Sequence, residues 1–270
     1  MRDITLGQFI PGDSCIHNLD PRTKILLMIV YIVLVFFVKS IIIFLVPLAL
    51  IIAVLLLSRI SLSYMWKSIK PLRFLLIIMF ILNLFFTKGE PLGDFFPLSY
   101  ISLASIRQSC FIALRLIFLV CGTSLMTLTT SPLALTDGLE RLLAPLKKIR
   151  FPAHELALMM TIALRFIPTL MEEADKIKKA QLARGADFES GNILKRAKSM
   201  IPILIPLFVS AFRRADELAL AMESRCYHGG DGRTKMHQIK LRLADLWASL
   251  VVLGLLALII VVQELVYIPW

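Results

Sequence analysis

Two arginines occupy equivalent places in a segment that the chain repeats after 41 residues. Ala174-Asp175 is followed nine residues later by Arg184, and Ala215-Asp216 is followed nine residues later by Arg225. A guanidinium carries five N–H donors in a rigid fork, which suits a carboxylate or a cluster of carbonyl groups. The repeat therefore indicates two similar polar contacts, each made to acidic or carbonyl groups of another protein.

The two arginines are flanked by small residues, as Ala183-Arg184-Gly185 and Ser224-Arg225-Cys226. Glycine enters the left-handed conformation that ends a helix at little cost, whereas cysteine enters it less readily. We therefore expect the first helix to end directly after Arg184. The second helix is expected to continue to Gly229-Gly230.

Each arginine also extends an apolar stripe with helical spacing. Alanine-rich stripes allow two helices to cross closely. Spacing alone leaves two interpretations open: contact with another protein, or two amphipathic helices packed together with an arginine at each C-terminus, where it favours the helix dipole. The stripes consist of Leu170, Ala174, Ile177 and Ala180 before Arg184, and of Phe208, Phe212, Ala215, Ala219 and Met222 before Arg225.

Other reactive residues do not form a recognisable active site. The sequence lacks the G-x-x-x-x-G-K-[ST] loop that binds nucleotide phosphates, and no second histidine follows His154-Glu155 at zinc-binding spacing. The four cysteines are scattered. We therefore predict a non-enzymatic chain with no catalytic residue, cofactor or metal ligand.

Arg115 and a group of three acidic residues are open to more than one interpretation. Arg115 lies in an apolar segment, where it could mark a substrate path, extend to the membrane surface or pair within the protein. Glu172, Glu173 and Asp175 are most simply a solvated helix face, or partners of lysines one turn further on.

The composition is that of a membrane protein with several spans. Apolar residues make up 58% of the chain and the mean hydropathy is +0.80, beyond the values of soluble domains. The net charge of +11 could suggest nucleic acid, but cytoplasmic loops of membrane proteins carry the same excess of basic residues. We therefore predict the lipid bilayer, and not nucleic acid, as a partner.

Five apolar stretches have the length of membrane spans. The stretch from Ile25 to Leu57 would be about 50 Å long as one helix, so we expect two short spans hinged at Lys39-Ser40. Further spans are expected at about Leu72–Phe86, Ile106–Leu128 and Leu246–Val262. An odd number of spans places the two termini on opposite sides of the membrane.

Basic residues predict the orientation. Loops on one side carry more lysine and arginine than loops on the other, which predicts a cytoplasmic N-terminus and an external C-terminus in the cell membrane. The first side has Arg2, Arg22, Lys24, Arg59, Lys67, Lys70 and Arg73, and the second has Lys39 and Lys88, with Arg107 as a possible third.

Several motifs are spread along the chain. They are Asp13-Ser14-x-Ile16-His17-x-Leu19-Asp20-Pro21-Arg22-Thr23-Lys24, Leu128-Thr129-Thr130-Ser131-Pro132, His154 to Leu158, Arg165-Phe166-Ile167-Pro168 and Ala183-Arg184-Gly185-Ala186-Asp187. Together they resemble the transmembrane T component of energy-coupling factor transporters, and the resemblance covers nearly the whole chain. The second tripeptide departs from the family's Ala-Arg-Gly motif at Ser224 and Cys226.

The resemblance implies a coupling function. In this family the T component joins two cytosolic ABC-type ATPases to one small membrane subunit that captures a vitamin or a transition-metal ion. Two long helices dock in grooves of the ATPases through their Ala-Arg-Gly motifs. The resemblance assigns this role to Arg184 and Arg225, with Ala183, Gly185, Ser224 and Cys226 beside them. The alternatives are a self-sufficient secondary transporter or channel, for which the apolar segments offer few polar or broken positions, and a membrane-bound enzyme.

The expected fold is all-α, with about five transmembrane helices and a cytoplasmic coupling module of amphipathic helices. The domains are expected at 1–24, a cytoplasmic N-terminal segment; 25–128, a four-helix transmembrane region; 129–245, the coupling module at the cytoplasmic membrane surface; and 246–270, the final transmembrane helix. Within the module we expect helices at about 133–148, 153–166, 168–186, 193–204 and 206–227, with prolines at helix starts or kinks.

Overall fold

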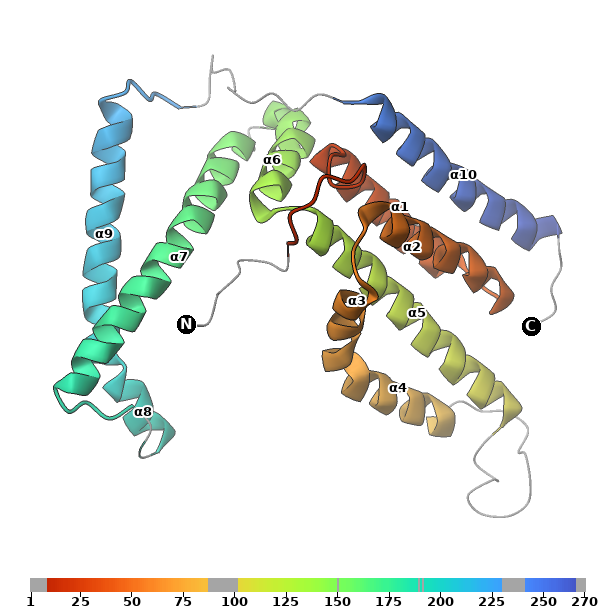
Figure 1. Ribbon diagram of the computed structural model, residues 1–270, viewed down its shortest axis with the longest axis horizontal. Coiled ribbons are helices and arrows are strands. Elements are labelled where there is room, and N and C mark those ends of the chain that lie inside the picture. The colour runs from red at the N-terminus through yellow and green to blue at the C-terminus, as the bar shows by residue number, and fades with distance from the viewer. Residues whose placement is uncertain are drawn as a thin grey trace. The chain divides into compact units, whose positions relative to one another are not determined.

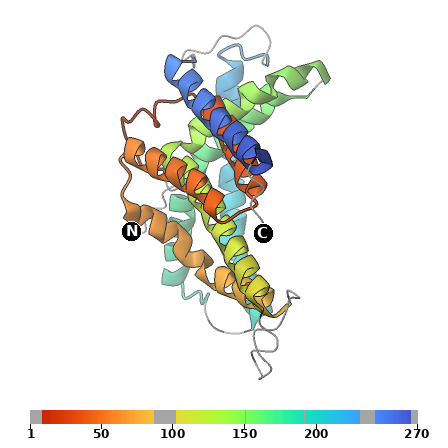
Figure 2. The same cartoon turned by 90° about the vertical axis from the view of Figure 1, so that its right-hand side faces the viewer.

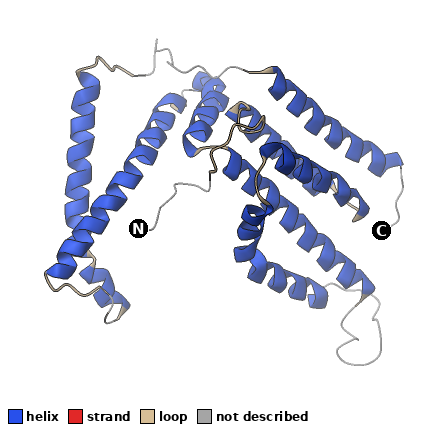
Figure 3. Cartoon of the chain, in the orientation of Figure 1, coloured by secondary structure: helices blue, strands red, loops and turns tan. Residues whose placement is uncertain are grey.

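The predicted all-α fold is confirmed. The computed structural model describes residues 9–86, 102–149, 151–188, 190, 192–229 and 241–265. Within these ranges all the regular secondary structure is helical (Figure 3). By their contacts, the described residues within Gly7–Leu139 and Ile239–Trp270 form one compact unit, here called the bundle unit. Those within Glu140–Gln238 form a second, here called the paired-helix unit.

The bundle unit is built from apolar helices (Figure 1). They are α1 (Pro21–Phe37), the 3-10 turn η1 (Ile42–Phe44), α2 (Leu45–Ser58), α3 (Leu62–Ile69), η2 (Lys70–Leu72), α4 (Arg73–Phe86), α5 (Leu103–Thr129) and α10 (Leu243–Leu265), with the start of α6 (Pro132–Leu143). The predicted break at Lys39-Ser40 is confirmed, because α1 ends at Phe37 and the next helical turn begins at Ile42.

Four helical segments of the described chain are long and apolar enough to cross a membrane: Leu62–Phe86, Leu103–Thr129, Ala153–Ala183 and Leu243–Glu264. Ile42–Ser58 is a shorter apolar helix. The third predicted span starts ten residues earlier than expected, at Leu62, because α3, η2 and α4 follow one another without a break. Of the basic residues used for orientation, Arg2 and Lys88 lie outside the described residues.

Helix α5 is the centre of the bundle unit, since it packs against α1, α2, α3 and α4. The Phe118 ring on α5 stacks on Phe44 with 5.3 Å between ring centroids, and the Tyr31 hydroxyl of α1 donates to the Phe118 carbonyl at 2.8 Å. Gly122, one turn after Phe118, makes room for the Tyr31 ring: a Cβ there would lie 2.2 Å from Tyr31 Cε1. This small residue therefore permits the close approach of α1 and α5.

Helix α10 runs parallel to α1 and is hydrogen-bonded to it at both ends. Near its start, Asp245 Oδ1 accepts a hydrogen bond from the Asp20 amide at 2.8 Å, and near its end Gln263 Nε2 donates to the Phe37 carbonyl at 2.9 Å. Between these two contacts Ile259 is almost fully buried. Figure 2 shows the two helices side by side.

The N-terminal motif forms a polar junction at the start of α1. Asp20 caps α1 by accepting from the Arg22 amide at 2.9 Å. Lys24 Nζ donates to the carbonyls of His17 at 3.1 Å and Thr129 at 2.9 Å, so it satisfies the carbonyl of the last residue of α5. The junction thus joins the N-terminus of α1 to the C-terminus of α5, where a positive charge is favourable.

Arg115 on α5 pairs within the bundle unit. Its Nη2 donates to the carbonyl of Val38, the residue that ends α1, at 3.0 Å. The guanidinium also lies over the Phe111 ring, 4.7 Å from its centroid. These contacts favour a structural role for Arg115 over a position on a substrate path.

The paired-helix unit contains the end of α6, η4 (Ala144–Ile149), α7 (Ala153–Ala183), α8 (Ile193–Ser199) and α9 (Ile201–Glu223). The predicted division into helices at 153–166 and 168–186 is wrong, because α7 continues through Pro168. A proline removes one backbone hydrogen bond, and a helix of 31 residues retains the others. Pro206 likewise lies inside α9, which begins at Ile201.

Candidate coupling site

The first arginine lies at the C-terminal end of α7. The Arg184 amide donates to the carbonyls of Ala180 and Gln181, at 3.2 and 3.1 Å, as the helix closes. Gly185 then turns left-handed with φ +82°. Its amide donates to Leu182 O and the Ala186 amide donates to Gln181 O, both at 3.0 Å. This pair of bonds is a Schellman cap, as the Ala-Arg-Gly sequence predicts.

The second arginine follows α9 and has the same cap, displaced by 41 residues. The Cys226 amide donates to Glu223 O at 2.8 Å, and the Tyr227 amide donates to Met222 O at 3.0 Å. Cys226 has φ +59°. The prediction that this helix continues to Gly229-Gly230 is therefore wrong, and Gly230 lies outside the described residues. The two hydrogen bonds satisfy helix-end carbonyls, which offsets the strain of a left-handed cysteine.

The six predicted site residues are accessible. Ala183, Arg184 and Gly185 are exposed at the end of α7, and Ser224, Arg225 and Cys226 are exposed after α9. Among the described residues, neither guanidinium has a hydrogen-bond or ion-pair partner. Each arginine thus offers a full set of donors to a partner outside the chain.

The stripes that lead to the arginines differ in burial. Leu170, Ala174 and Ile177 are half-buried on α7, whereas Phe208 and Phe212 on α9 are 60% and 68% exposed. The stripe on α9 is therefore not covered by the stripe on α7, as it would be if the two helices only packed on each other. A contiguous exposed apolar face of this kind marks a surface for a partner protein or a membrane.

An ion pair between α7 and α9 was missed by the sequence analysis. Arg214 Nη2 lies 2.9 Å from Glu173 Oε2, so Glu173 is not simply part of a solvated face. The two residues are themselves 41 positions apart, which means that equivalent positions of the repeat meet. The 41-residue offset of the repeat relates these two positions in the sequence, but by itself it does not show that the two helices pack together.

A second polar contact lies at the start of α7. His154 Nδ1 and Glu140 Oε1 are 3.0 Å apart, which links the start of α7 to the end of α6. Within the described part of the chain, no group of three or more histidine, cysteine or acidic residues is placed to hold a metal ion. The contact of His154 with Glu140 joins two neighbouring helices of the paired-helix unit.

Comparison with known proteins identifies the family. Residues 12–237 match the model of the CbiQ family, described as cobalt transport protein. The chain is 57% identical to the energy-coupling factor transporter transmembrane protein EcfT of Thermosediminibacter oceani, over 95% of this chain and 96% of the relative. It is 55% identical to that of Clostridium kluyveri, over 96% of each chain, and 45% identical to that of Lactococcus lactis subsp. cremoris, over 100% of this chain and 98% of the relative. The resemblance seen in the motifs is thus confirmed, and the chain belongs to the EcfT family as a non-catalytic, multi-pass transmembrane component of an energy-coupling factor transporter.

Proposed function

We propose that Arg184 and Arg225 dock in two cytosolic ABC-type ATPase subunits. The paired helices would carry the movement of these ATPases to one small membrane subunit, which captures a vitamin or a transition-metal ion for uptake. The observation that carries this proposal is the matched pair of exposed arginines, each lying within a Schellman cap, directly before its left-handed residue, and without a partner in the described chain.

The geometry of the paired helices supports contact with two separate partners. Helices α7 and α9 run in opposite directions (Figure 1), and Glu173 and Arg214 join them. Arg184 follows Glu173 by eleven residues, and Arg225 follows Arg214 by eleven. At 1.5 Å per residue each arginine is about 16 Å further along its own helix, and the two lie in opposite directions from the ion pair. One ATPase could engage each end.

We further propose a cytoplasmic N-terminus and an external C-terminus. The basic residues before α1 and between α2 and α4 favour this orientation, and the parallel course of α1 and α10 is consistent with five spans. The domain boundaries 1–24, 25–128, 129–245 and 246–270 remain part of the proposal. Although α7 has the length and composition of a span, we place it at the cytoplasmic surface because its second half carries Glu172, Glu173 and Asp175.

The test is a double substitution, Arg184→Ala with Arg225→Ala. Loss of one partner from a desolvated charged contact costs about 2–5 kcal/mol, so the variant should insert in the membrane yet lose both solute uptake and co-purification of the ATPases. Arg196→Ala with Arg213→Ala is the matched control. It removes the same charge from exposed positions of the same unit and should retain both properties. Wild-type uptake by the first variant would refute the assignment.

A further inference from the structure

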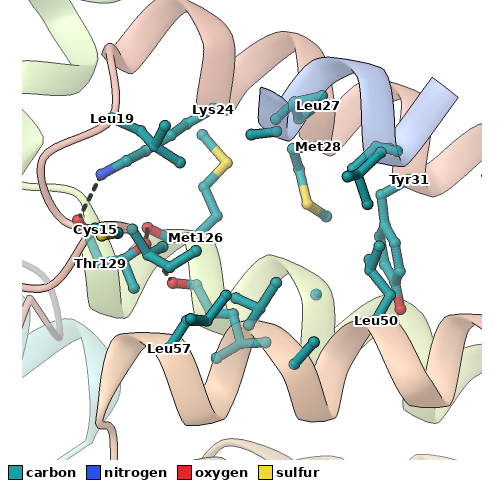
Figure 4. Close-up of a pocket in the computed structure, with 18 of the residues that line it drawn as sticks. Cys15, Leu19, Lys24, Leu27, Met28, Tyr31, Leu50, Leu57, Met126 and Thr129 are labelled. Carbon is teal, nitrogen blue, oxygen red and sulfur yellow. Dashed lines mark hydrogen bonds between the residues drawn. The ribbon is translucent and has the colours of Figure 1, made fainter. Parts of the chain in front are cut away.

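The bundle unit contains an open apolar cavity of about 410 Å³ (Figure 4). Its floor is formed by α1 and α5, with Tyr31 and Leu125 both buried. Residues of α2 and α10 line its sides, among them Val54 and Val252. The volume lies within the range of small-molecule sites, roughly 300–1,000 Å³.

The cavity is open along the flank of the bundle. The residues of α2 and α10 that line it include exposed side chains, with Leu57 57% exposed and Trp247 65% exposed. We expect the exposed apolar side chains of α2 and α10, among them Val251, to contact the hydrocarbon of the bilayer. A hydrocarbon chain can therefore enter the cavity sideways without crossing water.

One end of the cavity carries a positive charge. Lys24 belongs to the lining and is only 8% exposed, and Figure 4 shows it at one end beside Thr129. Its ammonium donates to two neutral carbonyls, and among the described residues no carboxylate lies within ion-pair distance of it, although the charge of the nearby Asp245 carboxylate acts on it. An ammonium has three donors, so one is left for a further acceptor. The phosphate of a lipid headgroup is an acceptor of this kind.

We propose that this cavity binds one anionic phospholipid. The phosphate lies at the Lys24 end, in the leaflet reached by the N-termini of α1 and α10, and an acyl chain extends toward Tyr31. Tyr31 follows Lys24 by seven residues of α1, or about 10 Å. Basic pockets between transmembrane helices are known sites for anionic headgroups, and each methylene that enters an apolar cavity adds to the affinity.

A helix of another protein fits the cavity poorly. An α-helix with its side chains is about 10–12 Å wide, so 410 Å³ would hold about one turn of it. A flexible acyl chain is narrow enough to follow the cavity past Met28 and Leu50, which line it further along. The shape thus favours a lipid over a partner helix.

The test compares two alanine-to-phenylalanine substitutions on α10. Ala248 lines the cavity, whereas Ala257 is exposed on the same helix and does not line it. The full-length protein is placed in nanodiscs that contain phosphatidylglycerol and phosphatidylethanolamine in equal amounts, and retained lipid is measured by native mass spectrometry. Wild type and Ala257→Phe should retain phosphatidylglycerol, and Ala248→Phe should retain at least about tenfold less.

Lys24→Gln tests the headgroup. This variant should lower the preference for phosphatidylglycerol over phosphatidylethanolamine about fivefold while an acyl chain is still retained. If it does not fold, the two α10 variants still decide the question. Equal retention by Ala248→Phe and Ala257→Phe, or no preference for the anionic lipid in wild type, would overturn the proposal. So would a disulfide between Ala248→Cys and a cysteine of the capture subunit, formed in the assembled transporter without bound lipid.

Discussion

Replacing Cys226 by glycine should stabilise the C-terminal end of α9. Cys226 holds φ at +59°, a region that costs a residue with a Cβ roughly 1–2 kcal/mol. Glycine removes this cost. It also gives the unfolded helix end more conformational freedom, which lowers the stability of the cap by about 0.4–1 kcal/mol. The net effect is a gain of about 1 kcal/mol, equivalent to about fivefold in an equilibrium constant.

The equivalent position of α7 predicts the opposite sign. A Cβ built on Gly185 meets no other atom within 4 Å, so the cost of Gly185→Ala comes from its backbone at φ +82° and not from a clash. After the same entropy term is subtracted, this variant should destabilise the cap of α7 by about 1 kcal/mol. The two caps thus form a reciprocal pair in which the same physical argument gives a gain at one and a loss at the other.

Hydrogen exchange measures both effects locally. The reporters are the capping amides, Tyr227 on α9 and Ala186 on α7, which each donate at 3.0 Å. Cys226→Gly should raise the protection factor of the first about fivefold, and Gly185→Ala should lower that of the second by about as much. Cys226→Ala is the control, since it removes the thiol and keeps the Cβ. Equal gains from Cys226→Ala and Cys226→Gly, or a loss from the glycine variant, would refute the reasoning.

Three further predictions concern the ion pair, the division of labour and the bundle core. Glu173→Arg or Arg214→Glu alone should reduce uptake, and the double swap should recover much of it, with a coupling energy of about 0.2–1 kcal/mol because both side chains are partly exposed; no recovery in the swap would contradict a positioning role. In liposomes, the purified chain should neither hydrolyse ATP nor move solute until the ATPases and a capture subunit are added, and ion-driven solute flux by the chain alone would favour a secondary transporter. Gly122→Ala should lower the free energy of unfolding by about 1–3 kcal/mol because of the Tyr31 ring; adding Tyr31→Leu should cost less than the sum of the two single changes if that contact is the cause.

The features that depend on local sequence could be predicted. Apolar length gives the spanning helices, and the hinge at Lys39-Ser40 follows because the 33 residues from Ile25 to Leu57, as one helix of about 50 Å, would exceed the bilayer thickness. The left-handed cap at Gly185 follows from the residue type. The family followed from motifs spread along the chain, although the contacts made by each motif did not.

The features that depend on tertiary contacts could not be predicted in this way. Cys226 is left-handed against its own preference because helix-end carbonyls gain donors there. The pairing of Glu173 with Arg214 requires two helices to pack side by side, which periodicity along one helix does not specify. Arg115 finds its acceptor, Val38 O, on a segment 77 residues away.

The pairing of α1 with α10 has a consequence for the order of assembly during synthesis. Asp20 and Asp245 are 225 residues apart, which a ribosome covers in about 10 to 45 s at 5–20 residues per second. Throughout that interval α1 is in the membrane without the carboxylate that accepts its Asp20 amide and without the helix that covers its flank. The bundle unit is therefore completed only after α10 has been made, and the long separation of its contacts along the chain implies slow closure. A chain truncated before Asp245 should show faster exchange of the Asp20 amide than the complete protein, and equal exchange would show that α1 reaches its final state alone.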